Sequence, residues 1–158
     1  MGEADPPERA VPFTACIITK DEESNLPACL GSVAFADEIV VVDSHSTDAT
    51  VAIAESFQAV GTGGREVRAR VIVRDWPGHV EQKNFAIEAA THDWVLSIDA
   101  DERVTPELRR EIEDVLSRPE SLANGYTMPR KTFYLGRPIL RGGWYPDRKL
   151  RLFQKSRG

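Results

Sequence analysis

The sequence has few cysteines, no long apolar run and no glycine-rich phosphate loop, and each lack argues against a class of protein. The two cysteines, Cys16 and Cys29, lie in apolar surroundings without metal-ligand spacing, which favours free buried thiols over a disulfide. No apolar stretch approaches the roughly 20 residues that span a bilayer. Residues 1–12 lack the basic start and apolar core of a secretory signal and are expected to be a disordered leader. We therefore expect a cytoplasmic protein.

Glycine is missing where a dinucleotide or triphosphate site needs it. The turn after the first predicted strand reads "TKDEESN", which is acidic, and "GTGG" at 61–64 follows a predicted helix rather than a strand. The chain also has no Gly-Lys-Ser/Thr element. The phosphates of a bound nucleotide would thus lack a backbone cradle, and a divalent metal could take its place.

Positive charge is concentrated at one end of the chain. The chain has a formal net charge of −5, yet residues 130–158 contain nine Lys or Arg and a single acid, Asp147. Such a segment favours an anionic partner, namely phosphate groups, a nucleotide or a membrane surface. The alternative is a solvated edge strand that lysine and arginine keep soluble.

Apolar runs alternate with helical patterns through most of the chain. With 158 residues and 41% hydrophobic composition, we expect one globular domain. An α/β half at 13–118 is expected to be followed by a β region at 119–158 within the same domain. Strands are predicted at 13–19, 38–44, 71–73 and 94–98. The alternation predicts a mostly parallel sheet with helices on both faces.

The segments between these strands have their own signals. Residues 61–70 are expected to form an exposed loop, and a helix is predicted at 79–90 with Val80 among its buried positions. Thr105 followed by proline predicts the start of another helix, because proline suits the first helical position.

Carboxylates follow two of the predicted strands. The segment "VLSIDADERV" runs from an apolar strand into Asp99 and Asp101, which can converge on one cation. Asp43 ends another strand, where it can accept hydrogen bonds from a ribose or a uracil-type N–H. Ligands bind at the carboxyl ends of strands in open α/β sheets. The neighbouring Ser46 and Asp48 offer further polar contacts, although residues there also cap helices.

Four segments together resemble the family 2 glycosyltransferases, which have the GT-A fold. They are "ACIITKDEESNL", "EIVVVDSHSTDAT", "QKNFAIEAA" and "VLSIDADERVTPEL", in the order of the family. "DADE" is similar to the family's Asp-x-Asp element. The later "GGWYPDRKLRLF" resembles the subgroup that builds the core of bacterial lipopolysaccharide. The fold implied is a Rossmann-like GT-A domain that binds a nucleotide-sugar.

The resemblance implies a role for each matching residue. Asp101 would bind Mg²⁺ or Mn²⁺ across the donor diphosphate, and Asp99 would face the ribose or the metal. The other positions implied on the donor side are Thr19, Glu22, Asp43, Ser44, Lys83 and Asn84, with Trp76 and His79 bordering the sugar pocket. Lys83 has the alternative of covering the helix surface, and His79 that of a capping or surface residue.

The resemblance also implies an inverting transfer with a carboxylate base. Asp147 is our candidate, because it is the single acid of the basic segment and lies near Trp144 and Tyr145, which could stack on an acceptor sugar. The alternative is an ion pair of Asp147 with Arg148 or Arg151. UDP-glucose is the favoured donor. The acceptor implied is a glycan or glycolipid, such as the lipopolysaccharide core at the inner face of the membrane, and no nucleic acid is expected.

Two other classes of function compete with this one. Family members of this kind are longer, so the acceptor-side region is expected to be truncated, and the chain could bind a nucleotide-sugar or a protein partner without catalysing transfer. A metal-dependent nucleotidyltransferase is the other alternative. That class needs a basic triphosphate loop near the N-terminus, where this chain has "KDEE".

Overall fold

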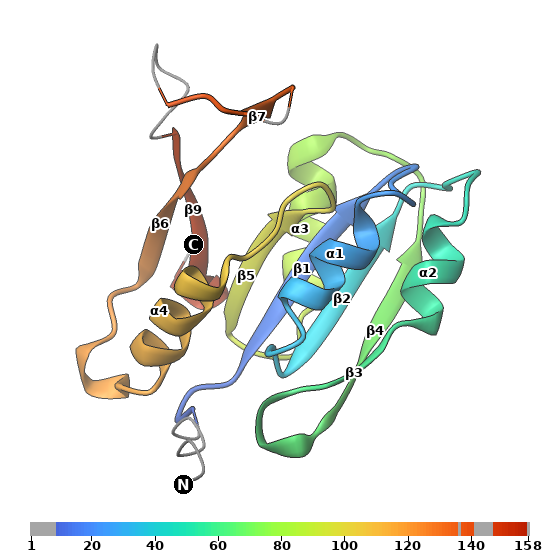
Figure 1. Cartoon of the computed structure of the whole chain (residues 1–158). Helices are drawn as coiled ribbons and strands as arrows, with labels where there is room; N and C mark the ends of the chain where they lie inside the picture. The colour runs from blue at the N-terminus through green and yellow to red at the C-terminus, as the bar shows by residue number, and fades with distance from the viewer. Residues whose placement is uncertain (1–8, 136, 141–146, 158) are drawn as a thin grey trace, which may run out of the picture.

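The computed structural model describes residues 9–135, 137–140 and 147–157, and these form a mixed β-sheet covered by helices (Figure 1). The sheet has the strand order β3-β4-β2-β1-β5-β9-β6. Its strands are β1 (Phe13–Thr19), β2 (Glu38–Asp43), β3 (Gln58–Val60), β4 (Glu66–Val73), β5 (Trp94–Asp99), β6 (Gly125–Arg130) and β9 (Asp147–Gln154). A separate ladder joins β7 (Phe133–Tyr134) and β8 (Arg137–Pro138). The helices are α1 (Leu26–Ser32), α2 (Thr50–Ser56), α3 (His79–Ala89) and α4 (Pro106–Leu116).

The centre of the sheet is parallel and buried on both faces. Strands β4, β2, β1 and β5 run in one direction, whereas β3 and β9 join them antiparallel at either side. Alternate residues of β1 face opposite layers, so Phe13 and Ile17 pack with α1 and α4 while Ile18 packs with α3. Helices therefore cover both faces, which confirms the predicted α/β class.

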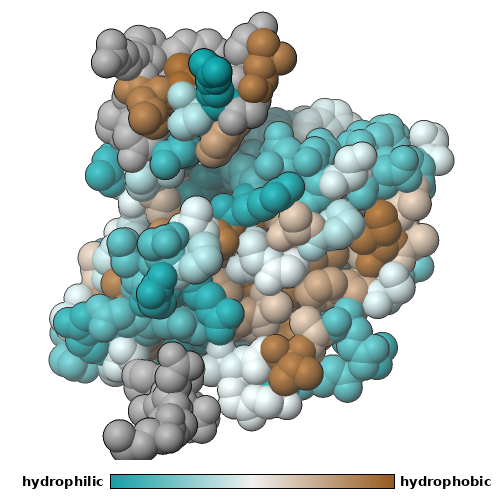
Figure 2. Space-filling view, viewed as in Figure 1, coloured by the Kyte–Doolittle hydropathy of each residue, from teal (hydrophilic) through white to brown (hydrophobic). Residues whose placement is uncertain are grey.

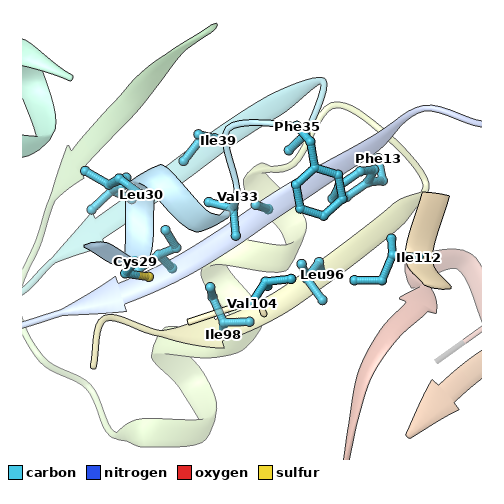
Figure 3. Packing of buried hydrophobic residues seen from close by; sticks show 14 of the residues in the cluster. Phe13, Cys29, Leu30, Val33, Phe35, Ile39, Leu96, Ile98, Val104 and Ile112 are labelled. Carbon is cyan, nitrogen blue, oxygen red and sulfur yellow. The ribbon is translucent and has the colours of Figure 1, made fainter. Parts of the chain in front are cut away.

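The larger core cluster lies between the sheet and the layer formed by α1, α2 and α4 (Figure 3). The rings of Phe13 and Phe35 lie 5.3 Å apart at their centroids. Leu96 of β5 and Ile112 of α4 extend the same cluster. Thr105 caps α4 as predicted, because its hydroxyl accepts a hydrogen bond from the Leu108 N–H at 3.2 Å.

Both cysteines are free and buried, as the sequence predicted. Burial raises the pKa of the Cys16 thiol to about 12 and that of the Cys29 thiol to about 12. Neither thiol is therefore ionised near neutral pH.

The prediction of an exposed loop at 61–70 was wrong, because β4 already begins at Glu66 and pairs antiparallel with β3. From Glu66 onward polar and apolar residues alternate, and this alternation buries Val67 to 4% exposure. The turn between the strands uses Gly63 and Gly64, with φ of 71° and 75°, a region that favours glycine. The glycines mark a hairpin turn rather than a long loop.

The burial predicted for Val80 was also wrong. Val80 is 66% exposed, whereas Gln82 is fully buried and Ala86 nearly so. These two residues are four apart, so they share the face of α3 that lies on the sheet. The buried face is therefore offset from the most apolar side chains of the helix.

The C-terminal strands form one edge of the sheet. β9 pairs antiparallel with β5, with Leu96 opposite Leu152, and β6 pairs with β9 as the edge strand. Because β9 is antiparallel to β5, β9 begins and β6 ends on the side where β5 ends. The β7–β8 ladder projects beyond the body of the sheet on that side (Figure 1). Within the described ranges, none of the helices has the length and apolar character required to cross a membrane.

Candidate functional site

The candidate site lies where β1, β2 and β5 end. Asp43 of β2 pairs with Thr19 of β1, and Asp99 of β5 pairs with Ile18 on the other side of β1. Asp43 and Asp99 are thus two strands apart, roughly 10 Å between Cα atoms from the usual strand spacing. The chain leaves β1 for β2 on one side and returns to β5 on the other, and ligands of open α/β sheets bind beside the strand ends at such a reversal. We call this region, with the loops at 20–25, 44–49 and 100–104, the donor crevice.

The loops after β1 and β2 are joined by reciprocal hydrogen bonds. The Thr47 N–H donates to Asp21 Oδ1 at 2.7 Å, and the Asp21 N–H donates to Ser46 Oγ at 2.8 Å. The Glu22 N–H donates to Thr50 Oγ1 at 2.8 Å, and Lys20 Nζ donates to the His45 carbonyl at 2.7 Å. The Thr47 backbone N–H is the main reason that the pKa of Asp21 is lowered. One side of the crevice is therefore built before any ligand arrives.

Asp43 organises the second of these loops. The side chain is 0% exposed, its Oδ2 accepts from the Ser46 N–H at 2.8 Å, and its Oδ1 accepts from Ser46 Oγ at 2.5 Å. A direct contact with a nucleoside base would require this carboxylate to become exposed. The predicted base contact of Asp43 stays a prediction.

Three buried polar atoms of the crevice have no hydrogen-bond partner among the described residues: Thr19 Oγ1, Gln82 Oε1 and Asp99 Oδ1. Gln82 reaches the crevice from α3, where its Nε2 donates to Ser44 Oγ at 3.0 Å. A buried polar atom without a partner costs about 1–3 kcal/mol. A polar ligand in the crevice can supply the missing partners, so these atoms fit the binding of a nucleotide.

Asp99 and Asp101 form the pair that the sequence singled out for a metal. Lys83 Nζ lies 2.9 Å from Asp99 Oδ1, at ion-pair distance but without the angle of a hydrogen bond. Asp101 is exposed in the turn that follows β5. The described residues contain no group of three metal-ligating side chains. Two carboxylates still suit Mg²⁺ or Mn²⁺ when phosphate oxygens and waters complete the coordination.

Sequence reasoning missed the pair that supports this turn, Glu102 and Arg151. Glu102 Oε2 accepts from the Asp99 N–H at 2.9 Å, and Glu102 Oε1 accepts from Arg151 Nη2 at 2.7 Å. Arg151, 8% exposed, also donates from Nη1 to the Ser97 carbonyl at 3.1 Å. Burial raises the pKa of Glu102. The alternation of basic and apolar residues in this strand predicts an exposed Arg151, so the sequence carries no local signal for this contact.

The remaining donor-side residues lie around the same crevice. Glu22 is half-buried and its Oε2 accepts from Asn25 Nδ2 at 2.9 Å. Trp76 and His79 precede and begin α3, with ring centroids 6.0 Å apart, and both are exposed. Asn84 is exposed on α3. Their predicted contacts with a donor stay predictions.

Asp147 begins β9, at the end of the sheet where the crevice lies. Its carboxylate contacts Arg130 at 3.0 Å and Lys149 at 3.2 Å. The pairing with Arg148 or Arg151 considered from the sequence was wrong, because Arg151 is taken up by Glu102 and the cross-strand register places Arg130 opposite Asp147. Trp144 and Tyr145, proposed to stack on an acceptor, lie outside the described residues.

Comparisons with known proteins agree on one family. The pattern of glycosyl transferase family 2 matches residues 14–155. The lipopolysaccharide core biosynthesis glycosyltransferase LpsC of Rhizobium meliloti is 32% identical over 148 residues, which is 94% of this chain and 53% of LpsC. The chain spans about a quarter to a half of the length of the curated relatives that it matches.

Two solved structures share the fold. S. aureus TarS 1–349 in complex with UDP-GlcNAc is 22% identical with a TM-score of 0.57, over 82% of this chain and 37% of that one. The mannosyltransferase PcManGT from Pyrobaculum calidifontis, in complex with GDP-Man and Mn²⁺, is 23% identical with a TM-score of 0.56, over 77% of this chain and 36% of that one. The architecture is thus that of the GT-A glycosyltransferases.

Proposed function

The chain belongs to glycosyl transferase family 2, and from that premise we propose that it binds a nucleotide-sugar and transfers the sugar to a glycan or glycolipid with inversion at the anomeric carbon. The observation that carries the proposal is the donor crevice. Thr19 Oγ1 and Gln82 Oε1 are buried there without a hydrogen-bond partner among the described residues, and the Asp99–Lys83 ion pair lies beside the exposed Asp101. A nucleoside diphosphate has the polar atoms that these groups lack.

The donor is proposed to be a UDP-sugar, with UDP-glucose favoured. The TarS structure contains UDP-GlcNAc and the mannosyltransferase structure contains GDP-Man with Mn²⁺, which supports a nucleotide-sugar donor and a divalent ion. LpsC takes its name from lipopolysaccharide core biosynthesis, and this supports a core oligosaccharide as the acceptor.

Asp99 and Asp101 would hold Mg²⁺ or Mn²⁺, and the bound ion would supply positive charge to stabilise a diphosphate leaving group. Lys83, already beside Asp99, is placed to contact the same phosphates. The acceptor hydroxyl attacks C1 while the bond from C1 to the diphosphate oxygen breaks, and the electron pair leaves with the diphosphate. Asp147 takes the hydroxyl proton, a role typically worth about 10²–10⁴ in rate.

Thermal shift measurements with a panel of nucleotide-sugars, with and without Mn²⁺, test the donor site. One donor should raise the melting temperature only when the metal is present, because the proposed site binds the donor diphosphate through the metal. A ligand at about 100 times its Kd stabilises the folded state by about 2.7 kcal/mol. Asp101→Asn should remove the metal-dependent part of this shift. Glu107→Gln, exposed on α4, is the matched control that should keep it. The absence of a shift with every donor would reject the site.

Asp147→Asn tests the base. Transfer should be abolished while the metal-dependent thermal shift persists, because Asp147 lies outside the donor crevice. The matched variant Glu120→Gln, exposed in the turn at Pro119–Ser121, should leave both unchanged. Substantial transfer by Asp147→Asn would reject the assignment of the base.

A second candidate function follows from the length comparison. The chain spans only part of its relatives, and Asp147 is held between two cations, so nucleotide-sugar binding without catalysis is the alternative. Calorimetry and a turnover assay with the same donor separate the two. Binding without transfer or donor hydrolysis would favour the alternative.

A further inference from the structure

An arm projects from the sheet and carries unusually exposed apolar side chains. We define the arm as the described residues 130–135, 137–140 and 147–150. Phe133 is 60% exposed, Leu135 87%, Leu140 50% and Leu150 55%. In Figure 2 hydrophobic side chains gather on this projection, above the body of the molecule. Exposed apolar side chains that gather in this way are typical of a surface that contacts another protein or a membrane.

Basic side chains surround these apolar residues. The exposed ones in the described part of the arm are Arg130, Lys131, Arg137, Arg148 and Lys149. Asp147 is the sole carboxylate in the same residues, and it already contacts Arg130 and Lys149. The arm therefore combines apolar side chains with a surplus of positive charge.

This combination selects among possible occupants. A second copy of the chain would bring the same positive charge onto the same surface, which opposes self-association. An anionic lipid bilayer offers phosphate groups to the lysines and arginines and, just beneath them, hydrocarbon for the apolar side chains. The chemistry of the arm matches both layers of that partner.

We propose that the arm docks the chain on an anionic lipid bilayer. Phe133, Leu135 and Leu140 enter the interfacial region, and the surrounding basic side chains face the lipid phosphates. The arm extends from the end of the sheet where the donor crevice opens, so docking brings the crevice towards lipid-linked acceptors. This last step rests on the proposed function, whereas docking itself requires neither donor nor metal.

Vesicle flotation tests the docking. The chain should float with vesicles of phosphatidylcholine and phosphatidylglycerol, should not float with phosphatidylcholine alone, and should bind less as salt rises. The double variant Leu135→Ser, Leu140→Ser should weaken binding by at least about tenfold, because each apolar side chain contributes through burial. The matched control is Val60→Ser, Val80→Ser, which changes apolar residues that are 75% and 66% exposed outside the arm. It should bind like the unchanged chain.

A fluorescent reporter separates insertion from surface attraction. Cys16 and Cys29 are buried, so Leu135→Cys provides a single accessible thiol for an environment-sensitive dye. The dye should shift to shorter wavelength on anionic vesicles, and the same dye at Val60→Cys should not. No flotation, or flotation that survives the double serine variant, would overturn the proposal. A concentration-dependent dimer that the double variant abolishes would also overturn it, by assigning the arm to a second copy.

Discussion

The donor crevice and the arm are held in place by different means. In the crevice, the loops after β1 and β2 donate hydrogen bonds to each other, and Glu102 and Arg151 anchor the turn after β5. In the arm, Arg130 and residues 147–150 belong to the β6–β9 pairing, whereas the contacts described beyond it are the short β7–β8 ladder and the Ile139 N–H donating to the Thr132 carbonyl at 2.9 Å. The crevice is organised by internal contacts, whereas the arm leaves its apolar side chains outside. The difference separates a site whose loops are fixed by internal hydrogen bonds from a surface that we propose is covered by a lipid bilayer.

The largest expected effect is on stability, from a matched pair of phenylalanines. Phe13→Ala should lower the free energy of unfolding by about 3–5 kcal/mol, because Phe13 is fully buried against Phe35. Phe133→Ala, in the arm, should change it by less than about 0.5 kcal/mol. Urea unfolding followed by circular dichroism measures both. Equal losses would mean that the arm packs into the core.

Arg151→Met should be the next most damaging change, because it leaves Glu102 without its cation. Removing one partner of a buried ion pair costs about 3 kcal/mol. Arg148→Met, which alters an exposed arginine of the same strand, is the control and should be nearly neutral.

The loss in Arg151→Met should depend on pH. Burial raises the pKa of Glu102 above its ordinary value of 4.5, so the folded state favours the protonated acid. That preference stabilises the folded chain fully below pH 4.5 and is lost as the pH rises through the folded-state pKa. The destabilisation should therefore be largest near neutral pH and shrink on acidification. Unfolding curves across this range measure it, and a loss that does not vary with pH would contradict the role of Glu102.

Thr50→Val should have a smaller effect, confined to the donor crevice. Thr50 Oγ1 accepts from the Glu22 N–H and donates to Asp48 Oδ1, so the variant leaves a backbone donor without its partner and should cost about 1–2 kcal/mol. Donor binding should weaken in parallel, because the two loops lose a link. Thr127→Val, on the exposed face of β6, is the control. Calorimetric titration and urea unfolding report the two quantities.

The last prediction concerns acid pH, through Asp37, a carboxylate at the opposite end of the sheet. Burial acts to raise the pKa of Asp37, but the Phe13 N–H, Arg65 and Arg9 outweigh it and hold the pKa below 3.8. The contribution of Asp37 to stability is therefore complete above pH 3.8 and is lost as the pH falls through the lowered pKa. Asp37→Asn should flatten this acid limb, because an amide does not titrate. Urea unfolding at acid and neutral pH measures this. An equal loss of unfolding free energy on acidification in Asp37→Asn and in the unchanged chain would contradict the prediction.

Much of the fold could be predicted because local signals agreed with the tertiary structure. The run from Ile39 to Val42 is apolar on both faces, as a strand between two helical layers must be. Thr105 and Pro106 likewise placed the start of α4. The sequence pattern did not reveal the start of β4. Charged residues alternate with apolar ones there, and the preceding glycines favoured the prediction of a loop.

The candidate site could be predicted only as far as strand ends define it. The acids at 43, 99 and 101 follow apolar strands, so their place at one edge of the sheet was accessible from the sequence. The contact between Glu102 and Arg151 joins residues 49 apart, and it depends on the register of β9 against β5. The burial of Asp43 beneath Ser46 depends on the path of a loop. Neither contact has a local signature.

The two outer strands of the sheet have a consequence for polymerisation. β3 is only three residues long, and β6 contains Pro129, which has no backbone N–H to offer to an incoming strand. Neither edge strand is therefore a good template for pairing with a strand of another molecule. A concentrated solution of the folded chain should resist fibre growth, even though the centre of the sheet is rich in valine and isoleucine.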